Sequence, residues 1–414
     1  MLYNLFIAFL RTAFAAAALL QPKARAFVSG RKNIFKKLEQ TFAHHTAPVI
    51  WIHCASLGEF EQGRTLMEAV KMQLPDHKIL LTFFSPSGYE VRKNFAFADF
   101  VFYLPWDTQQ NALRFISITK PVLAIFIKYE FWYHYSVMLK KHNVPLLSVS
   151  SIFRKNQLFF KSYGGFYREI LKNFTYFFVQ NDTSVSLLRS IGIDNCRRAG
   201  DTRFDRVVSL TQEKVDLPIV EKFKDGQRTW VIGSCWPEDI AVLAPLINES
   251  ENKLKFVIAP HEISESFLSS IKKLIQLKTV RFSHAANVSD IAQYDVLLVD
   301  NIGMLSKLYR YGEFAYVGGA FGKGLHNILE PACYGIPVFF GDKKYEKFQE
   351  AVDLIMRGGA FEVSGYTDLR SKYELLVSRP ENYLLACEVT SLYIQENIGA
   401  TNVVMEYCKK LLRA

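Results

Sequence analysis

Residues 316–341, YVGGAFGKGLHNILEPACYGIPVFFG, decide the fold class of this chain. An apolar run is followed by the glycine-rich loop 318–324, a helical pattern and a second apolar run that ends at Gly341. Glycines let the backbone turn tightly and approach a ligand. A helix that begins after them directs free N–H groups at an anion. The stretch therefore predicts a strand, loop, helix and strand that hold a phosphorylated ligand.

The loop differs from two common phosphate-binding patterns. It is one residue short of Walker A, with Gly324 where Ser or Thr should follow Lys323, and Asn327 replaces the last glycine of G-x-G-x-x-G. A tight turn without a ligand is the alternative. Glu330, one helical turn beyond Asn327, favours a ligand because a carboxylate can accept hydrogen bonds from ribose hydroxyls. Phosphate at the helix start and sugar one turn later describe a nucleotide.

Short β-rich runs alternate with helical patterns along most of the chain, in two series. This alternation is typical of parallel sheets covered by helices on both faces. We therefore expect an α/β fold of two doubly wound Rossmann-like domains that face a central cleft, with ligands at the carboxyl ends of the strands. The predicted strands are Val49–His53, Ile79–Phe84, Phe100–Tyr103, Val122–Ile127, Leu146–Val149, Tyr176–Val179, Thr229–Ile232, Leu254–Ala259, Thr279–Phe282, Val296–Val299, Phe314–Val317 and Val338–Phe340.

Length and composition support two domains. The chain has 414 residues, of which 50% are hydrophobic, enough for two cores. The polar stretch 208–224, rich in Lys and Glu, predicts a linker between domains over 38–207 and 225–379. Residues 380–414 read as helices that return to the first domain.

The first 37 residues predict a membrane-associating helix and a basic segment. Leu2–Leu20 is almost wholly apolar, and its polar residues Asn4, Arg11 and Thr12 fall on one helical stripe. Nineteen helical residues span roughly 28 Å, which is marginal for a bilayer, so we expect a helix in the membrane interface. Lysines and arginines between 23 and 37 suit an anionic cytoplasmic leaflet. A cleaved signal peptide is the alternative, disfavoured because its positive charge would follow the apolar run.

The formal charge of +10 favours anionic partners. Nucleic acid is not expected as a partner, because neither a dense basic tract nor a known nucleic-acid-binding motif is present.

The six cysteines are scattered without metal-ligand spacing, which predicts free thiols in the reducing cytoplasm. We expect no metal and no cofactor.

Three charged residues form a second candidate site. Glu59 follows the strand Val49–His53 in the first turn of a helix, where a carboxylate either merely favours the helix dipole or serves as a general base. Glu130 follows the strand Val122–Ile127 and so lies on the same rim. Arg203, just before the predicted linker, either faces the cleft or forms a surface salt bridge.

These segments, in this order and spacing, resemble the 3-deoxy-D-manno-octulosonic acid (Kdo) transferases of lipopolysaccharide synthesis. The resemblance extends to about Val363. It implies the two-domain GT-B fold and inverting transfer of Kdo from CMP-Kdo to a lipid A precursor (lipid IVA), at the cytoplasmic face of the cell inner membrane. The landmarks are Ser56–Glu59, Glu130–Trp132, Gly200–Asp205, Gly233–Ser234, Ala259–His261, Asp300–Gly303, His326–Pro331, Gly341 and Phe348.

The resemblance also implies roles for individual residues. Glu59 corresponds to the catalytic base, and Glu130 and Arg203 to positions that stabilise the transition state, with Arg203 where lysine is usual. Ser234, Lys323 and His326 are further candidates for contact with the donor phosphate. The implied CMP-binding residues are Pro260, His261, Ile302, Gly303, Met304, Asn327, Ile328, Leu329 and Glu330.

The donor site departs from the family pattern at three places. Pro260-His261-Glu262 stands where the family has Pro-Arg-His, Met304 replaces a glutamate, and Leu325 replaces a glycine.

Two other functions stay open. A GT-B enzyme that uses a UDP-sugar would differ by binding UDP rather than CMP, and a non-catalytic membrane-bound lipid-binding protein would release no CMP.

Overall fold

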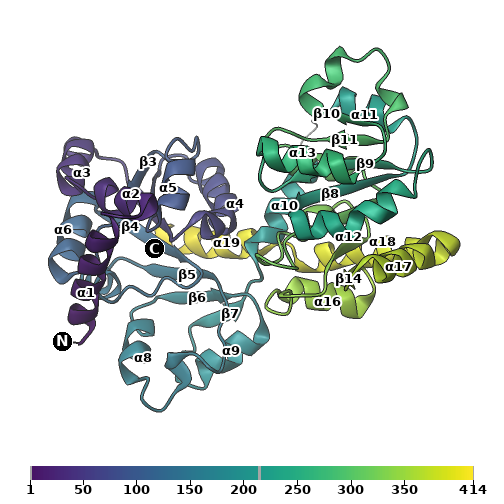
Figure 1. Cartoon of the computed structure of the whole chain (residues 1–414). Helices are drawn as coiled ribbons and strands as arrows, with labels where there is room; N and C mark the ends of the chain where they lie inside the picture. Colours follow the sequence, from purple (N-terminus) through teal and green to yellow (C-terminus); the bar gives the residue numbers. More distant parts are fainter. Residues whose placement is uncertain (1, 213–215, 414) are drawn as a thin grey trace. The chain divides into compact units, whose positions relative to one another are not determined.

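The chain divides into two compact units in the computed structural model, which describes residues 2–212 and 216–413 (Figure 1). Unit 1 comprises Met1–Arg206 and Ile398–Ala414, and unit 2 comprises Val207–Asn397. The chain therefore leaves unit 1, builds all of unit 2 and then returns to unit 1. Part of the predicted linker, residues 213–215, lies outside the described residues.

The described residues of unit 1 form a seven-stranded parallel sheet in the order β3-β2-β1-β4-β5-β6-β7. The strand order changes direction between β1 and β4, and ligands of doubly wound sheets bind at such a switch point. The strands are β1 (Val49–Cys54), β2 (Lys78–Phe83), β3 (Phe100–Tyr103), β4 (Pro121–Ile127), β5 (Leu146–Ser151), β6 (Tyr176–Val179) and β7 (Cys196–Arg198).

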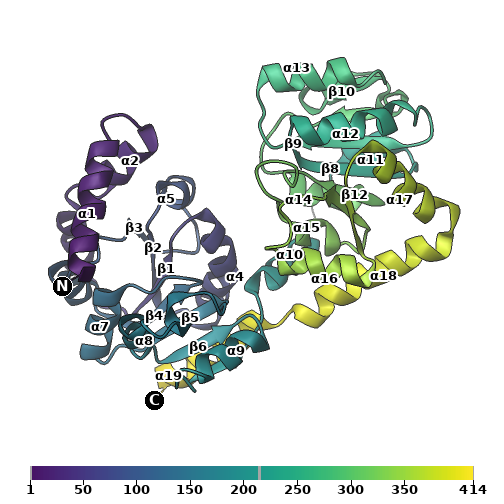
Figure 2. The ribbon, with the colours of Figure 1, turned by 60° about the horizontal axis from the view of Figure 1, so that its bottom comes forward.

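Helices cover both faces of this sheet (Figure 2). Leu38, Phe115 and Leu139 belong to the core on one face, whereas Leu66 and Val404 belong to the core on the other. The helices of unit 1 are α1 (Leu2–Ala17), α2 (Pro22–Gly30), α3 (Ile34–Phe42), α4 (Leu57–Gln73), α5 (Pro86–Arg92), α6 (Gln109–Thr119), α7 (Tyr133–Lys141), α8 (Gly165–Leu171), α9 (Asp182–Arg189) and α19 (Ala400–Arg413).

The C-terminal helix α19 completes unit 1. Val404, Met405 and Cys408 are buried in its core. Thr401 Oγ1 lies 3.0 Å from Thr65 Oγ1 of α4, and the ring of Tyr407 lies 4.8 Å from that of Tyr176 in β6. Residues from 398 onward thus belong to unit 1, while the rest of the predicted C-terminal segment 380–414 belongs to unit 2.

The described residues of unit 2 form a second seven-stranded parallel sheet, in the order β10-β11-β9-β8-β12-β13-β14. Its switch point lies between β8 and β12, so the glycine loop after β12 begins beside the end of β8. The strands are β8 (Thr229–Cys235), β9 (Lys255–Pro260), β10 (Thr279–Arg281), β11 (Val296–Leu298), β12 (Phe314–Val317), β13 (Val338–Gly341) and β14 (Ala360–Val363).

Helices also flank the second sheet, whose core contains Trp230, Phe256 and Tyr316. The boundary between the units falls within α10 (Thr202–Gln212). The predicted linker 208–224 contains the end of α10 and all of α11. The helices that follow α10 are α11 (Pro218–Lys224), α12 (Pro237–Asn248), α13 (Glu265–Leu274), α14 (Leu305–Leu308), α15 (Leu329–Ala332), α16 (Gln349–Arg357), α17 (Tyr366–Ser378) and α18 (Pro380–Asn397).

The N-terminal helix α1 packs on unit 1 while keeping apolar side chains at the surface. Phe14 stacks on Phe27 of α2 with ring centroids 4.2 Å apart, and Asn4 Oδ1 lies 2.6 Å from His134 Nε2. Leu5 and Phe9 are 58% and 69% exposed. Across residues 2–212 and 216–413, we find no helix with the length and hydrophobicity that a membrane crossing requires.

Candidate active site

Glu59 lies at the N-terminus of α4, directly after β1. Ser56 is the N-cap residue of this helix, and its hydroxyl donates a hydrogen bond to the Glu59 carboxylate. The free N–H groups of a first helical turn favour an anion at this place. Glu59 is only partly exposed, so its carboxylate is oriented by the turn rather than free in solvent.

Glu130 lies shortly after the end of β4, and the side chains of Trp132 and His53 hold its carboxylate. Trp132 Nε1 donates to Glu130 Oε2 at 2.7 Å, and His53 Nε2 lies 3.1 Å from the same oxygen. His53 is fully buried, and its Nδ1 lies 2.8 Å from Thr82 Oγ1 on β2. Three neighbouring strands therefore fix the orientation of the Glu130 carboxylate, which retains 13% exposure.

Arg203 is connected to α4 through a buried carboxylate. Its backbone N–H and its Nε each donate to Asp201 at 2.9 Å, and Asp201 is only 5% exposed. Gln62 Nε2, one turn after Glu59 on α4, lies 3.4 Å from both Asp201 oxygens. The salt bridge considered for Arg203 thus exists, but its carboxylate partner is buried in unit 1 and not on the surface.

The glycine loop of unit 2 is a closed turn. Gly319 adopts φ +97°, and a Cβ there would lie 2.4 Å from the carbonyl oxygen of Gly324, so only glycine fits. The N–H of Gly318 donates to Gly233 at 2.9 Å, and the N–H of Gly324 donates to Gly319 at 2.8 Å. The N–H of Gly319 donates to Asp239 Oδ2 at 2.9 Å. These three N–H groups are hydrogen-bonded within the protein and are not available to a phosphate.

Asp239 of α12 joins this loop to the end of β8. It is fully buried and also accepts hydrogen bonds from the Trp236 N–H at 2.8 Å and the Tyr316 hydroxyl at 2.9 Å. Burial raises the pKa of the Asp239 carboxyl, and these hydrogen bonds oppose the rise. The carboxyl fixes the two turns at the switch point of unit 2 relative to each other.

The helix predicted after the loop is present but short. Only Leu329–Ala332 are helical, as α15, and a helix of one turn has a small dipole. Asn327 precedes it, and its Oδ1 accepts a hydrogen bond from the Leu329 N–H at 3.3 Å. Its Nδ2 donates to Glu330 at 3.1 Å, so the two residues predicted one helical turn apart contact each other directly.

Three planar rings pack together beside the loop. The imidazole of His261 stacks on Trp236 and on His326, with centroid distances of 4.6 and 4.4 Å. Trp236 Nε1 donates to His326 Nε2 at 3.2 Å, which requires that nitrogen to be unprotonated. Burial, followed by repulsion from His261, lowers the pKa of His326 to about 4. Lys323 Nζ lies 5.5 Å from the centre of the Trp236 ring.

The remaining donor-site candidates lie at the same edge of the second sheet. Ser234 is near the end of β8 and has φ +51°, and Pro260 ends β9 as a buried residue. Ile302–Met304 form a surface loop beyond β11, where Ile302 is 91% exposed. The structure therefore places all candidates of unit 2 at carboxyl ends of its strands, and their role in nucleotide binding stays a prediction. Among the described residues we find no cluster of three or more metal-ligating side chains.

Sequence reasoning missed His53, Trp132 and Trp236. Each is a polar or aromatic residue at the end of an otherwise apolar strand or at the start of the following helix. His53 carried the clearest signal, because it is the one histidine in the otherwise apolar run Val49–Cys54.

Solved structures with the same architecture define the class of fold. A UDP-GlcNAc 2-epimerase from Neisseria meningitidis is similar over 88% of this chain and 100% of its own, with TM-score 0.60 and 15% identity. A glycosyltransferase from Rickettsia africae is similar over 89% and 99%, with TM-score 0.57 and 13% identity. The chain therefore has a two-domain GT-B-like α/β fold, as predicted.

Sequence relatives narrow this class to a family. Residues 30–206 match the family model described as 3-deoxy-D-manno-octulosonic-acid transferase (kdotransferase). The transferase of that name from Aquifex aeolicus is 28% identical over 335 residues, 80% of this chain and 86% of the relative. That from Rickettsia typhi is 26% identical over 368 residues, 86% and 78% of the two chains. The chain is therefore similar to Kdo transferases over at least 80% of its length, which confirms the predicted resemblance to this family of glycosyltransferases and the prediction of an enzyme.

Proposed function

We propose that this enzyme transfers Kdo from CMP-Kdo to a hydroxyl of a lipid A precursor, with inversion at the anomeric carbon. The observation that carries the proposal is the carboxylate of Glu59, hydrogen-bonded by Ser56 at the N-terminus of α4 and at the switch point of unit 1. The similarity to Kdo transferases supports the choice of Kdo as the transferred sugar.

In the proposed reaction, Glu59 takes the proton of the attacking acceptor hydroxyl. The hydroxyl oxygen forms the new bond to the anomeric carbon of Kdo while the bond to the phosphate of CMP breaks, so the products are glycosylated lipid, CMP and one proton. Glycosyl transfer develops positive charge on the sugar, and the fixed carboxylate of Glu130 suits that charge. Arg203 suits an anionic group of the donor.

Side chains of unit 2 carry more of the proposed nucleotide binding than its backbone does. Several N–H groups of the glycine loop already have partners, and the arginine usual in the family is replaced by His261. Lys323, Ser234 and His261 are therefore the proposed phosphate contacts. Asn327, Ile328, Leu329 and Glu330, with Pro260 and Ile302–Met304, are proposed to surround the rest of CMP.

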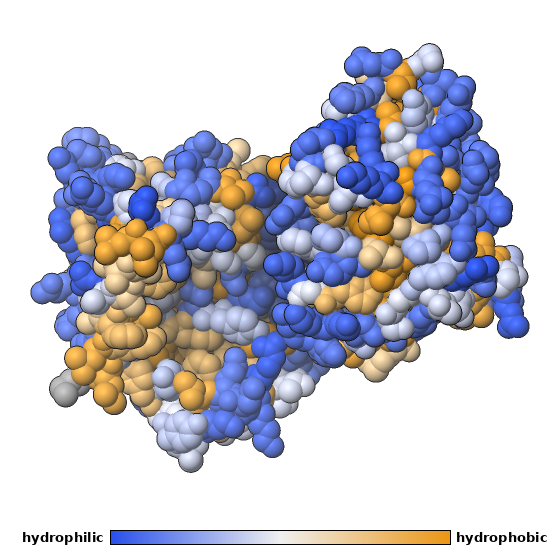
Figure 3. Space-filling view, viewed as in Figure 1, coloured by the Kyte–Doolittle hydropathy of each residue, from blue (hydrophilic) through white to orange (hydrophobic). Residues whose placement is uncertain are grey.

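We also propose that unit 1 works at the cytoplasmic face of the inner membrane, with α1 in the interface. Its apolar residues are exposed at the surface, visible as orange patches in Figure 3. The basic residues that follow favour anionic head groups.

The test is mass spectrometry of the lipid acceptor after incubation with CMP-Kdo, for the wild type, Glu59→Gln and Glu61→Gln. Loss of a general base costs about 10²–10⁴-fold in rate, so Glu59→Gln should form almost no product. Glu61, two residues along the same helix, pairs with Arg92 and has no proposed role, so Glu61→Gln should keep nearly full activity. Near-normal turnover by folded Glu59→Gln would refute the base assignment, and an inactive wild type would refute the donor or acceptor.

A further inference from the structure

An apolar pocket opens in unit 1 between the N-terminal helices and the start of α5. Its volume is about 440 Å³, within the usual range of roughly 300–1,000 Å³ for ligand sites. Small residues of α1 and α2 leave the space, and three aromatic rings form much of its wall. The small residues are Ala13, Ala17 and Ala24, and the aromatic residues are Phe14, Phe27 and Phe84.

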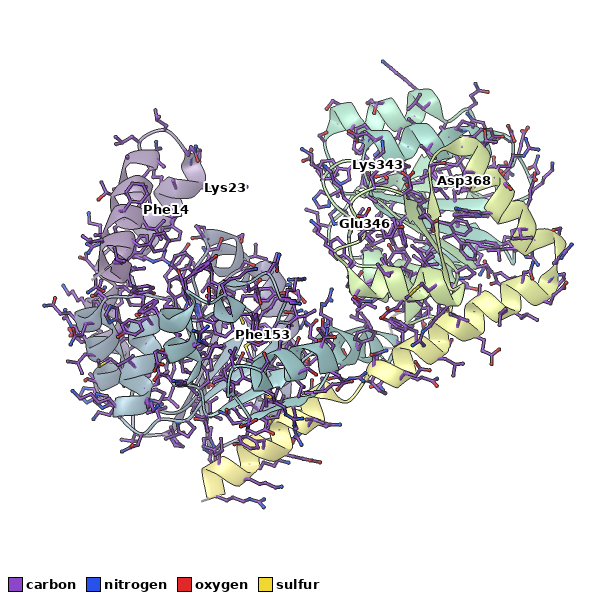
Figure 4. All side chains as sticks on the ribbon, turned by 90° about the horizontal axis from the view of Figure 1, so that it is seen from below. Phe14, Lys23, Phe153, Lys343, Glu346 and Asp368 are labelled. Carbon is purple, nitrogen blue, oxygen red and sulfur yellow. The ribbon has the colours of Figure 1, made fainter. Side chains whose placement is uncertain are left out.

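The polar groups of the pocket are few and stand at its rim. Lys23 and Gln21 are exposed residues at the start of α2, and Ser85 lies at the other side, after β2. Figure 4 shows Phe14 on α1 and Lys23 next to it on α2. None of the described residues that line the pocket is acidic. An apolar chain with an anionic head group suits this distribution.

The pocket wall contacts the turns that carry Glu59 and Glu130. The ring of Phe84 lies 4.9 Å from that of Trp132, which donates the hydrogen bond to Glu130. The N–H groups of Phe84 and Ser85 donate to the carbonyl of Ala55 at 3.2 and 2.7 Å, and Ala55 precedes the N-cap of α4. The pocket wall is therefore in direct contact with residues next to Glu59 and Glu130.

The same wall is held rigidly by Arg31, a buried cation. Its guanidinium donates to the carbonyls of Phe27 at 3.0 Å, Phe84 at 2.6 Å and Leu104 at 2.9 Å. It also lies 3.8 Å from the centre of the Phe27 ring. Two of the three aromatic walls are thus fixed to one another, and the pocket is formed before any ligand arrives.

We infer that this pocket holds one acyl chain of the lipid that accepts the sugar. The inference rests on the proposed function, and it adds a substrate-recognition site to it. The chain would lie against Phe14, Phe27 and Phe84, and Lys23 would face an anionic group of the lipid. A bulk membrane phospholipid is the competing occupant, and the binding test below distinguishes it from the acceptor.

The kinetic test fills the pocket. Ala17→Phe places a ring in it, whereas Ala16→Phe makes the same change at an exposed neighbour outside the lining. In detergent micelles, Ala17→Phe should raise KM for the acylated acceptor about tenfold or more and leave kcat/KM for the deacylated sugar unchanged. Ala16→Phe should resemble the wild type with both acceptors. Equal KM values for the two variants, or equal losses with both acceptors, would overturn the inference.

A binding test without catalysis separates this inference from the proposed function. Trp106 lies 5.9 Å from Phe14 and 5.4 Å from Phe27, between ring centroids, so a brominated acyl chain in the pocket should quench its fluorescence. Quenching by the brominated acceptor should occur at lower concentration than by brominated phosphatidylglycerol and should weaken in Ala17→Phe. Quenching by the brominated acceptor without transfer of Kdo would support acyl-chain binding in the pocket and refute the transferase reaction. Equal quenching by both lipids would refute the acceptor as its occupant.

Discussion

A single carboxylate oxygen of Glu130 receives the indole N–H of Trp132 and faces the imidazole of His53. Hydrogen bonds to ionised groups are short and strong, and here the donor Trp132 and the neighbouring His53 are rings that packing holds in one orientation. Trp132 also contacts Phe84. The carboxylate is thus a preorganised group whose direction is set before substrate binds.

We predict that Trp132→Phe lowers kcat with little change in KM. The phenyl ring keeps the contact with Phe84 but removes the donor to Glu130. A hydrogen bond to a charged group contributes about 1.5–3 kcal/mol, so kcat should fall roughly 10–100-fold. Steady-state kinetics with CMP-Kdo and lipid acceptor measure this. Trp106→Phe is the control, and a change confined to KM would contradict a role for Glu130 in the transition state.

The positions of these residues were more predictable than their partners. Glu59 and Glu130 could be placed from the sequence because each follows an apolar run, and strand ends of parallel sheets share an edge. The hydrogen bonds of His53 join β1, β2 and β4, which are distant in sequence. No local pattern encodes such contacts, since they depend on which strands become neighbours.

At the scale of elements, the rings beside the glycine loop form a unit that is sensitive to protons. Trp236 donates to His326 only while His326 Nε2 is unprotonated, and the folded pKa of His326 is about 4. In the unfolded chain the pKa of a histidine side chain is about 6.5. Between these values the unfolded chain binds more protons, so this group makes folding stability fall as the pH drops from about 6.5 to about 4.

We therefore predict that His326→Gln flattens part of the acid dependence of unfolding. Glutamine can accept from Trp236 but does not titrate, so the unfolding temperatures of the wild type and His326→Gln should converge, or cross, as the pH falls through this window. Above pH 7 their difference should be constant. Thermal unfolding by circular dichroism between pH 4 and 8 measures this, with His284→Gln at an exposed position as the control. Parallel curves for wild type and His326→Gln would contradict the prediction.

The elements that sequence analysis predicted correctly are the long apolar ones. All twelve predicted strands overlap strands among the described residues, because buried parallel strands are continuous apolar runs. The two missed strands, β7 and β14, are two of the four edge strands, and β7 carries two arginines. The helix predicted after the glycine loop has only one turn, because it begins at Leu329, whose N–H donates to Asn327, and Gly335 follows closely. The period of apolar residues in the sequence does not predict where such an edge strand pairs or where so short a helix begins, because both depend on contacts with other parts of the fold.

For the whole molecule, we predict that α1 mediates binding to anionic membranes. Phe9 is 69% exposed on α1 and should enter the lipid interface. Phe9→Asp should strongly reduce the fraction of protein that floats with phosphatidylglycerol vesicles. Leu385→Asp, at a residue 57% exposed on α18, should not. Equal flotation of the two variants would refute a membrane role for α1. Added salt should weaken wild-type binding, because the basic residues after α1 contribute through screened charges.

The route of the chain, which leaves unit 1 at Arg206 and returns at Ile398, has a consequence for how the protein is made. Synthesis proceeds from the N-terminus, and domains begin to fold as they emerge. Unit 2 lies on one uninterrupted segment and is complete before α19 exists. Its synthesis takes roughly 10–40 s at about 5–20 residues per second. Through that interval the nascent unit 1 lacks α19, whose Val404 and Met405 belong to the same core as Val70 and Phe178. Unit 1, whose sheet precedes unit 2 in the chain, therefore closes its core last, and until then part of its apolar core is exposed to chaperones and to other chains.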